Sequence, residues 1–354
     1  MNLRTSIFDA LNLTRSHRLT QATQTIQAAI LGRMQHAKEP NAPVHAKYSG
    51  KSVRPLGQVV QTLQKLKQSP FPFGKVGRRP ISIEPEIAKG AQFLTRSFSC
   101  KAGSRSYKLY VPNLQLDTKR PLLIMLHGCK QNPSDFAVGT RMNTLAETHG
   151  MLVAYPAQIQ SANPSACWNW FDPGHQHSGM GEPAIIAGLT AEIIESHDID
   201  RTKIFVAGLS AGGAMAVVMG ETYPEVFSGV GVHSGLPYKS ANDVVSAFAA
   251  MRGDVPLMKV VPKLRTIVFH GDADRTVAPS NGVNIVGGAA FARAEYISDQ
   301  YTRRVSRDSH GKPIFEHWTL HGAAHAWSGG DAAGSFTYPD GPDVSAEMIR
   351  FFLI

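Results

Sequence analysis

Apolar and polar residues are arranged in two different ways along this chain. Before residue 90 the apolar positions recur at helical spacing, with one stripe over 20–35 and a second over 56–67. From about residue 92 short apolar runs alternate with segments that are long enough for helices. This alternation is typical of a mostly parallel sheet with helices on both faces. The pattern therefore predicts a partly helical N-terminal extension over 1–95 and an α/β domain over 96–354.

The apolar runs of the second part predict its strands. An alternating run at 107–111 is typical of an outer strand, and a continuous run at 121–126 of a buried one. Further strands are predicted at 151–155, 203–207, 229–232, 266–269 and 314–320, and helices at 141–148, 183–196, 211–221 and 345–354.

The strand predicted at 203–207 ends in the sequence Gly-Leu-Ser-Ala-Gly at 208–212, where a helix begins. Strand, sharp turn and helix in this order are the pattern of a nucleophile elbow. The turn strains the backbone at the serine, so small residues must flank it, and Gly208 and Gly212 meet this need. The strain lifts the hydroxyl out of the sheet, where a base and a substrate can both reach it. Ser210 is therefore the predicted nucleophile.

A serine nucleophile needs a base, and the base needs an acid to orient it. The strand predicted at 266–269 runs into His270, and Asp272 and Asp274 follow in the next loop. A loop at the carboxyl end of a parallel strand is where this acid must lie to reach the base. Asp274 has the appropriate offset and is the predicted acid. Asp272 is its competitor, better suited to a turn or cap, and His270 is interpreted as a structural polar residue.

The base is predicted in the small-residue loop that follows 314–320. His321 and His325 compete for this role. His325 lies deeper in the loop and is followed closely by Trp327, so it is the predicted base. Serine, acid and base then occur in the chain order of an α/β-hydrolase.

An oxyanion hole needs backbone N–H groups that are fixed before the reaction. One is predicted at Ala211, directly after the nucleophile. The second is predicted in the loop after 121–126, which reads His-Gly-Cys at 127–129, with the N–H of Cys129 as the donor. Most of the chain's histidines are interpreted as packing or loop residues, among them His127, His233 and His317.

The tract 167–174 is unusually aromatic for a loop. Aromatic faces beside a cleft bind apolar or planar acyl groups. Trp168, Trp170 and Trp327 are therefore the predicted substrate-binding residues, and at least one of them should line the pocket. The alternative is that the tract forms a satellite core under a long loop.

The positive charge of the chain is concentrated at its N-terminus. Residues 1–100 hold 15 Lys and Arg against 4 Asp and Glu, whereas the remainder holds 21 against 23. This arm is either a solvated extension or a segment that docks on an anionic surface such as a phospholipid layer or a coated granule. No nucleic-acid module accompanies the charge, so no specific nucleic-acid binding is predicted.

Other classes of protein are less compatible with this sequence. No apolar run approaches the ~20 residues of a membrane span, and the first residues contain no long apolar segment of a secretory signal. A cytoplasmic protein is expected unless it is exported by another route. The three cysteines, Cys100, Cys129 and Cys167, lack the spacing of a zinc site, so no metal is predicted. They are three reduced thiols, or one disulfide and one free thiol in an oxidising compartment.

Together these motifs resemble the esterase family of poly(3-hydroxybutyrate) depolymerases, which also includes feruloyl and acetylxylan esterases. The resemblance covers roughly residues 98–354. It implies an α/β-hydrolase fold and a triad of Ser210, Asp274 and His325 that acts on carboxylic esters without a cofactor. It also implies a disulfide between Cys129 and Cys167. The matching segments are 126–129 with Gln131 and 135–136, 155–158, 167–171, 207–215, 233–235, 270–277 and 322–330.

The expected function is that of a serine esterase acting on poly(3-hydroxybutyrate), its oligomers or related short-chain hydroxyacyl esters. Secreted members that degrade the polymer usually carry a leader and a separate substrate-binding domain, neither of which is evident here. Soluble esters, oligomers or amorphous polymer are therefore favoured over crystalline polymer. The alternatives are a feruloyl, acetylxylan or general short-chain carboxylesterase, and an acyl transferase on the same triad. A non-enzymatic alternative is a surface-binding scaffold that uses the basic arm.

Overall fold

A computed structural model describes residues 84–354 of the protein, apart from 115–116, 255–260 and 288–293. The chain divides into two units, Met1–Gly77 and Arg78–Ile354. The two helical stripes predicted in the basic extension lie outside the described residues. All described residues belong to the second unit.

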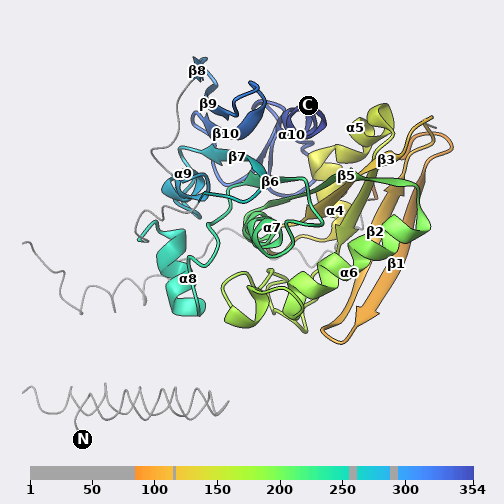
Figure 1. The fold of residues 1–354 in the computed structure, drawn as a ribbon. Coiled ribbons are helices and arrows are strands. Elements are labelled where there is room, and N and C mark those ends of the chain that lie inside the picture. The colour runs from red at the N-terminus through yellow and green to blue at the C-terminus, as the bar shows by residue number, and fades with distance from the viewer. Residues whose placement is uncertain (1–83, 115–116, 255–260, 288–293) are drawn as a thin grey trace, which may run out of the picture. The chain divides into compact units, whose positions relative to one another are not determined.

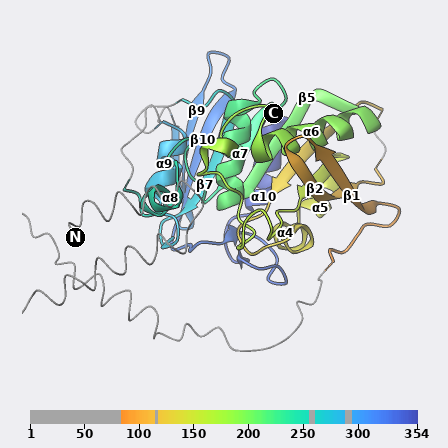
Figure 2. The ribbon, with the colours of Figure 1, turned by 90° about the horizontal axis from the view of Figure 1, so that it is seen from below.

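A ten-stranded sheet forms the centre of this unit (Figure 1). Its strands are β1 (Gln92–Cys100), β2 (Gly103–Val111), β3 (Arg120–Leu126), β4 (Leu152–Pro156), β5 (Ile199–Leu209), β6 (Gly229–His233), β7 (Arg265–Gly271), β8 (Ala294–Ile297), β9 (Tyr301–Arg307) and β10 (Pro313–Leu320). They lie in the order β1-β2-β4-β3-β5-β6-β7-β10-β9-β8. Neighbours from β4 to β10 are parallel. Antiparallel strands flank them, β1 and β2 at one edge and β9 and β8 at the other. Figure 2 shows β1 and β2 on the opposite side of the unit from β9.

Helices cover both faces of the sheet. They are α4 (Pro133–Thr140), α5 (Met142–His149), α6 (Gly181–Ser196), α7 (Ala211–Thr222), α8 (Val244–Met251), α9 (Ser280–Ile285) and α10 (Val344–Leu353), with a short 3-10 helix at Pro173–His175. Successive side chains of a strand point to opposite faces. Leu122 and Ile124 of β3 therefore pack in one core with α6 and α7, while Leu123 and Met125 pack in a second core with α5 and α10.

The predicted fold class is confirmed, since this is the layered, mostly parallel sheet of an α/β-hydrolase. Each predicted strand is present, as β2 to β7 and β10, and each predicted helix of this part is present, as α5, α6, α7 and α10. β1 begins at Gln92 and so includes residues that the sequence assigned to the extension. Two short strands, β11 (Trp327–Ser328) and β12 (Thr337–Tyr338), form a separate pair. No helix of the described part combines the length and apolar character needed to cross a membrane.

Candidate active site

Ser210 lies at the sharp turn between β5 and α7. Its backbone has φ 57° and ψ −120°, a conformation that residues other than glycine rarely adopt. Its N–H donates to the carbonyl oxygen of His233 at 2.9 Å, which holds the turn against the end of β6. A Cβ at Gly208 would lie 2.6 Å from the carbonyl oxygen of Leu126, so the approach of β5 to β3 requires a glycine there. The structure thus contains the elbow that the sequence predicted.

Asp274 and His325 form a close pair between two loops. The Nδ1 of His325 lies 2.7 Å from Oδ2 of Asp274. The other carboxylate oxygen, Oδ1, accepts the backbone N–H groups of Thr276 and Val277, both at 2.9 Å. His270 adds a fourth contact, with its Nε2 3.5 Å from Oδ2. Because Nδ1 of His325 donates to the carboxylate, Nε2 is the ring nitrogen left to accept a proton.

The carboxylate of Asp274 remains ionised in this setting. Its side chain is buried, and burial by itself raises the pKa of Asp274. Hydrogen bonds from His270 and His325, the charge of His325 and the N–H of Val277 outweigh burial and hold that pKa well below its usual range. A buried, ionised acid on Nδ1 is the arrangement that orients a histidine as a general base.

The two competing residues of the sequence analysis form a pair of their own. His321 Nδ1 lies 3.2 Å from Oδ2 of Asp272, and its Nε2 lies 3.1 Å from the hydroxyl of Thr302. Asp272 also accepts the N–H of Gly322 at 2.8 Å. This pair therefore joins the same two loops that carry Asp274 and His325, but its histidine is directed to a strand residue rather than toward the elbow.

Both predicted oxyanion donors lie beside the nucleophile. Cys129, Ser210 and Ala211 line one cavity. Ala211 begins α7, and the N–H groups of a helix's first turn have no acceptor within the helix. The N–H of Cys129 has no acceptor among the described residues. The neighbouring N–H groups are all bound, that of Gly128 to Gln131 Oε1 at 2.9 Å, that of Lys130 to Ser165 O at 2.8 Å, and that of Gln131 to Gly128 O at 3.3 Å.

The cavity beside Ser210 has a volume of about 290 Å³ and mostly apolar walls. Of the described residues that line it, none carries a charge. The disulfide between Cys129 and Cys167 forms part of the wall, which confirms the pairing implied by the family resemblance, and Cys100 is free and exposed. The other lining residues are Asn163, Ser165, Trp170, Phe171, Leu236, Val244, Ala247, Phe248, Met251 and Val277.

Of the three predicted substrate-binding tryptophans, Trp170 lines this cavity. The prediction for Trp168 and Trp327 needs correction, because both are core residues with 0% and 1% of their surface exposed. Trp168 donates its Nε1–H to the carbonyl of His127 at 3.1 Å. Trp327 stacks on His233 and donates to Ser345 at 3.0 Å. A ring enclosed in this way cannot touch a substrate in the cavity.

Sequence reasoning missed several residues that shape the site. α8 supplies Ala247, Phe248 and Met251 to the cavity wall, and no helix was predicted there. The second group is a buried polar network in which Glu182 accepts from Asn169 and Gln158. This network holds the aromatic loop. The sequence offered no signal for it, because its members lie in separate segments.

His233 is a packing residue, as the sequence predicted, although it adjoins the triad. Burial, together with the charges of His270 and His325, lowers its pKa to about 3. Its neutral ring accepts the N–H of Ser328 at 3.3 Å and stacks between Trp327 and Phe269. It thereby supports the loop that carries the base.

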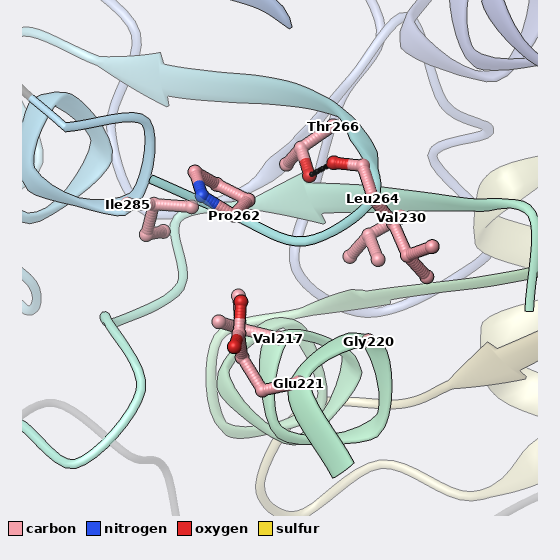
Figure 3. A pocket seen from close by; sticks show the side chains of 8 residues that line it. All are labelled: Val217, Gly220, Glu221, Val230, Pro262, Leu264, Thr266 and Ile285. Carbon is pink, nitrogen blue, oxygen red and sulfur yellow. Dashed lines mark hydrogen bonds between the residues drawn. The ribbon is translucent and has the colours of Figure 1, made fainter. Parts of the chain in front are cut away.

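A second, much smaller cavity lies between α7, β6 and β7 (Figure 3). Its volume is about 10 Å³, and its walls include Val217, Val230 and Ile285. The hydroxyl of Thr266 is bound to the carbonyl of Leu264 at 2.9 Å. A space of this size holds no substrate. Within the described ranges, no three His, Cys, Asp or Glu side chains are grouped so that they could hold a metal ion.

The chain is similar to a solved structure and to several curated proteins. An acetyl xylan esterase from Aspergillus awamori superimposes with a TM-score of 0.59 at 21% identity, over 74% of this chain and 98% of the other, which shows the shared fold. Poly(3-hydroxyalkanoate) depolymerase C of Paucimonas lemoignei is 31% identical over 250 residues, 65% of this chain and 60% of the relative. A probable acetylxylan esterase A of Aspergillus fumigatus is 31% identical over 220 residues, 56% of this chain and 58% of the relative.

The chain thus spans about 60% of the length of these curated relatives. The model of the family described as "Esterase PHB depolymerase" matches residues 105–310, which include Ser210, Asp274 and both oxyanion-hole candidates. That match covers more than half of the chain. The chain therefore belongs to the esterase family of PHB depolymerases.

Proposed function

We propose that this protein is a serine esterase that hydrolyses neutral carboxylic esters through an acyl-enzyme on Ser210. One observation carries the proposal. Ser210, whose backbone is strained, lines an apolar cavity. The wall of this cavity also contains Cys129 and Ala211, the two candidate oxyanion donors. The close pair of Asp274 and His325 supplies the matching acid and base.

The chemistry follows from these positions. His325, oriented by Asp274, takes the proton of Ser210 at Nε2 as the serine oxygen attacks the ester carbonyl carbon. The negative charge that develops on the carbonyl oxygen is stabilised by the N–H groups of Cys129 and Ala211. The alcohol leaves with the proton from His325. Water, deprotonated by the same histidine, then hydrolyses the acyl-enzyme and restores the serine.

The walls of the cavity favour an uncharged acyl group. Since the described lining residues are uncharged, an acyl group that carries a free carboxylate would lose its hydration without gaining a partner. A short, neutral hydroxyacyl chain avoids this cost. We therefore propose poly(3-hydroxybutyrate), its oligomers and related short-chain hydroxyacyl esters as substrates. Membership of a family named for PHB depolymerases supports this choice.

One further feature favours a polyester over an acetyl group on a polysaccharide. Val244 and Phe248 of α8 line the cavity and are also 55% and 57% exposed, so its apolar wall continues onto the outer surface. Val245, beside them, is 79% exposed. A long apolar chain can contact this surface outside the cavity, whereas a sugar backbone gains little from it.

The test compares two substrates in the wild type and Ser210→Ala. We expect the wild type to release 3-hydroxybutyrate from amorphous poly(3-hydroxybutyrate) and to hydrolyse p-nitrophenyl butyrate. Ser210→Ala should do neither, while Ser309→Ala, a serine in a distant turn, should behave like the wild type. Hydrolysis of the small ester alone would contradict the polyester substrate. Activity on neither would contradict the ester class, and a methyl ester formed in preference to the acid in added methanol would indicate acyl transfer.

A further inference from the structure

The peptide that carries one oxyanion donor is held by the side chain of its neighbour. His127 follows β3 and is buried, with 1% of its surface exposed. Its Nδ1 lies 2.8 Å from the carbonyl oxygen of Gly128. Its Nε2 accepts the backbone N–H of Gln158 at 3.0 Å. Both nitrogens of this ring are therefore engaged with backbone groups.

These two contacts determine the protonation of the ring. A carbonyl oxygen can only accept, so Nδ1 carries the hydrogen, and a backbone N–H can only donate, so Nε2 carries none. Burial lowers the pKa of His127 to about 4, and the hydrogen bond to Gly128 and the charge of Asp135 offset this only in part. At neutral pH the ring is therefore uncharged, with its single hydrogen directed at Gly128.

The geometry of a trans peptide transmits this contact to the oxyanion hole. The C=O and N–H of one peptide group point in opposite directions. Since the carbonyl of Gly128 is drawn toward the His127 ring, the N–H of Cys129 points away from it. That N–H has no acceptor within the described part of the chain, and Cys129 lines the cavity with Ser210. A peptide turned the other way would place a carbonyl oxygen where the oxyanion must form.

We infer that His127 is a positioning residue of the oxyanion hole, which fixes the Gly128–Cys129 peptide so that the Cys129 N–H faces the reacting ester. This inference rests on the proposed esterase function. His127 itself touches neither the substrate nor the reacting atoms. It acts through the direction of one peptide group.

Further buried residues hold the ring and the backbone of His127 in place. Gln158, whose N–H binds the ring, accepts from Arg105 at 2.9 Å through its side chain and donates to Glu182, which is 1% exposed. Trp168 binds the carbonyl of His127 at 3.1 Å. The buried tryptophan that the sequence assigned to substrate therefore supports the loop of the hole instead. A second bond to the Gly128 carbonyl, from the Gln131 N–H at 3.3 Å, is longer than that from His127.

The test uses three substitutions at His127, which remove the two hydrogen bonds of its ring separately or together. In His127→Asn the amide nitrogen occupies the position of Nδ1 and can still donate to Gly128. In His127→Gln the amide lies near the position of Nε2, and in His127→Leu both bonds are lost. His317→Leu is the control, because His317 is also buried and its pKa is likewise lowered by burial, to about 3.

We expect His127→Leu and His127→Gln to lower kcat for p-nitrophenyl butyrate by about 10- to 100-fold, less than the loss of a complete donor. KM should change little, because the donor acts mainly in the transition state. Affinity for butylboronic acid, which forms a tetrahedral anion on the serine, should fall by a similar factor. His127→Asn should restore most of both losses, and His317→Leu should retain wild-type values per titrated active site.

Wild-type kcat and boronate affinity in His127→Leu would overturn the inference, as would equal losses in His127→Asn and His127→Gln. Should His127→Leu fail to fold, the comparison of His127→Asn with His127→Gln decides alone, since both variants keep an uncharged amide at residue 127 and differ in which of the two ring nitrogens it replaces. Ser210→Ala separates a failure of the proposed esterase mechanism from a failure of the proposed role of His127. If that variant retains activity, the esterase mechanism fails, whereas an inactive Ser210→Ala with a fully active His127→Leu contradicts only the role of His127.

Discussion

Several residues near the site have positive φ angles although they are not glycine, among them Lys130 at 66°, Ser210 at 57° and Ser234 at 51°. Such conformations persist only where the surroundings impose them. The N–H of Ser210 is held by the carbonyl of His233, and that of Ser234 by Phe269, both at 2.9 Å. The strained backbone at Ser210 and Ser234 is therefore supported by the ends of β6, which adjoins the nucleophile strand β5, and of β7.

At the scale of single residues, Asp274→Asn tests which acid orients the base. Oδ1 of Asp274 accepts two backbone N–H groups, so the amide nitrogen of the asparagine must take the place of Oδ2, facing His325. It would donate to Nδ1 and force the ring hydrogen onto Nε2, which then cannot accept the serine proton. We expect kcat for p-nitrophenyl butyrate to fall by about 10³- to 10⁴-fold.

The matched control for this substitution is Asp272→Asn. Asp272 is in the same loop and is also paired with a histidine, but its side chain is 43% exposed and its partner is directed at Thr302. We expect this variant to retain activity within about threefold, because exposed pairs contribute little free energy. A larger loss of kcat in Asp272→Asn than in Asp274→Asn would reverse the assignment.

Secondary-structure elements were predictable from the sequence where burial is uniform. The parallel strands β3, β4, β6 and β7 and the second half of β5, from Ile204, are buried and appear as mostly apolar runs. β9 was missed because it is largely polar and Arg303, in its middle, packs over Trp318 and pairs with Glu316. α8 was missed because its apolar residues occupy both faces, with Ala247 buried and Val245 exposed, so no amphipathic period is visible.

A role of the exposed side of α8 in binding the polyester can be tested separately from the reaction at Ser210. Val245 is 79% exposed and does not line the cavity, so Val245→Asp leaves the catalytic residues untouched. A charge there should weaken adsorption to an apolar polyester, and we expect release of 3-hydroxybutyrate from amorphous polymer to fall by about three- to tenfold. Hydrolysis of dissolved p-nitrophenyl butyrate should not change.

The control for adsorption is Ile297→Asp. Ile297 is 74% exposed on the edge strand β8, so it introduces the same charge at a comparable exposure. It should leave both activities unchanged. Equal losses on polymer in the two variants would mean that general surface charge, and not α8, governs adsorption. An unchanged rate in Val245→Asp would remove α8 from the substrate-binding surface.

At the scale of the whole molecule, the order of the motifs along the chain predicted which loops meet at the active site. It did not predict which side chains of those loops line the cavity. The loops after β3, β5, β7 and β10 lie at the carboxyl ends of neighbouring strands, so the sequence could bring Ser210, Asp274 and His325 to one edge of the sheet. Trp168 and Trp170 are two residues apart in one loop, yet the first is enclosed and the second lines the cavity. The conformation of the loop determines which of the two tryptophans is buried, and no periodicity in the sequence indicates that conformation.

The buried histidines connect the fold to its response to pH. Burial lowers the pKa of His127 to about 4 and of His233 and His317 to about 3, below the value of 6.5 in an unfolded chain. The unfolded state therefore binds more protons as the pH falls below about 6.5, and folding loses stability in that direction. Each histidine should cost about 2 kcal/mol by pH 5. Asp274 does not change the stability between pH 6.5 and pH 5. Its pKa is lowered from 3.8, so the stability that its ionised carboxylate contributes is lost only in stronger acid.

We therefore expect the free energy of unfolding, measured with urea, to be constant above about pH 7.5 and to fall steeply from pH 6.5 to pH 5. His317→Leu isolates one contribution, because the Nε2 of His317 has no hydrogen-bond partner among the described residues. That variant loses no hydrogen bond at Nε2 and removes one histidine whose pKa burial lowers, so its stability should decline by about 2 kcal/mol less than that of the wild type between pH 6.5 and pH 5. A decline parallel to that of the wild type would show that His317 is not kept neutral by the fold, and that other groups set the acid limit of its stability.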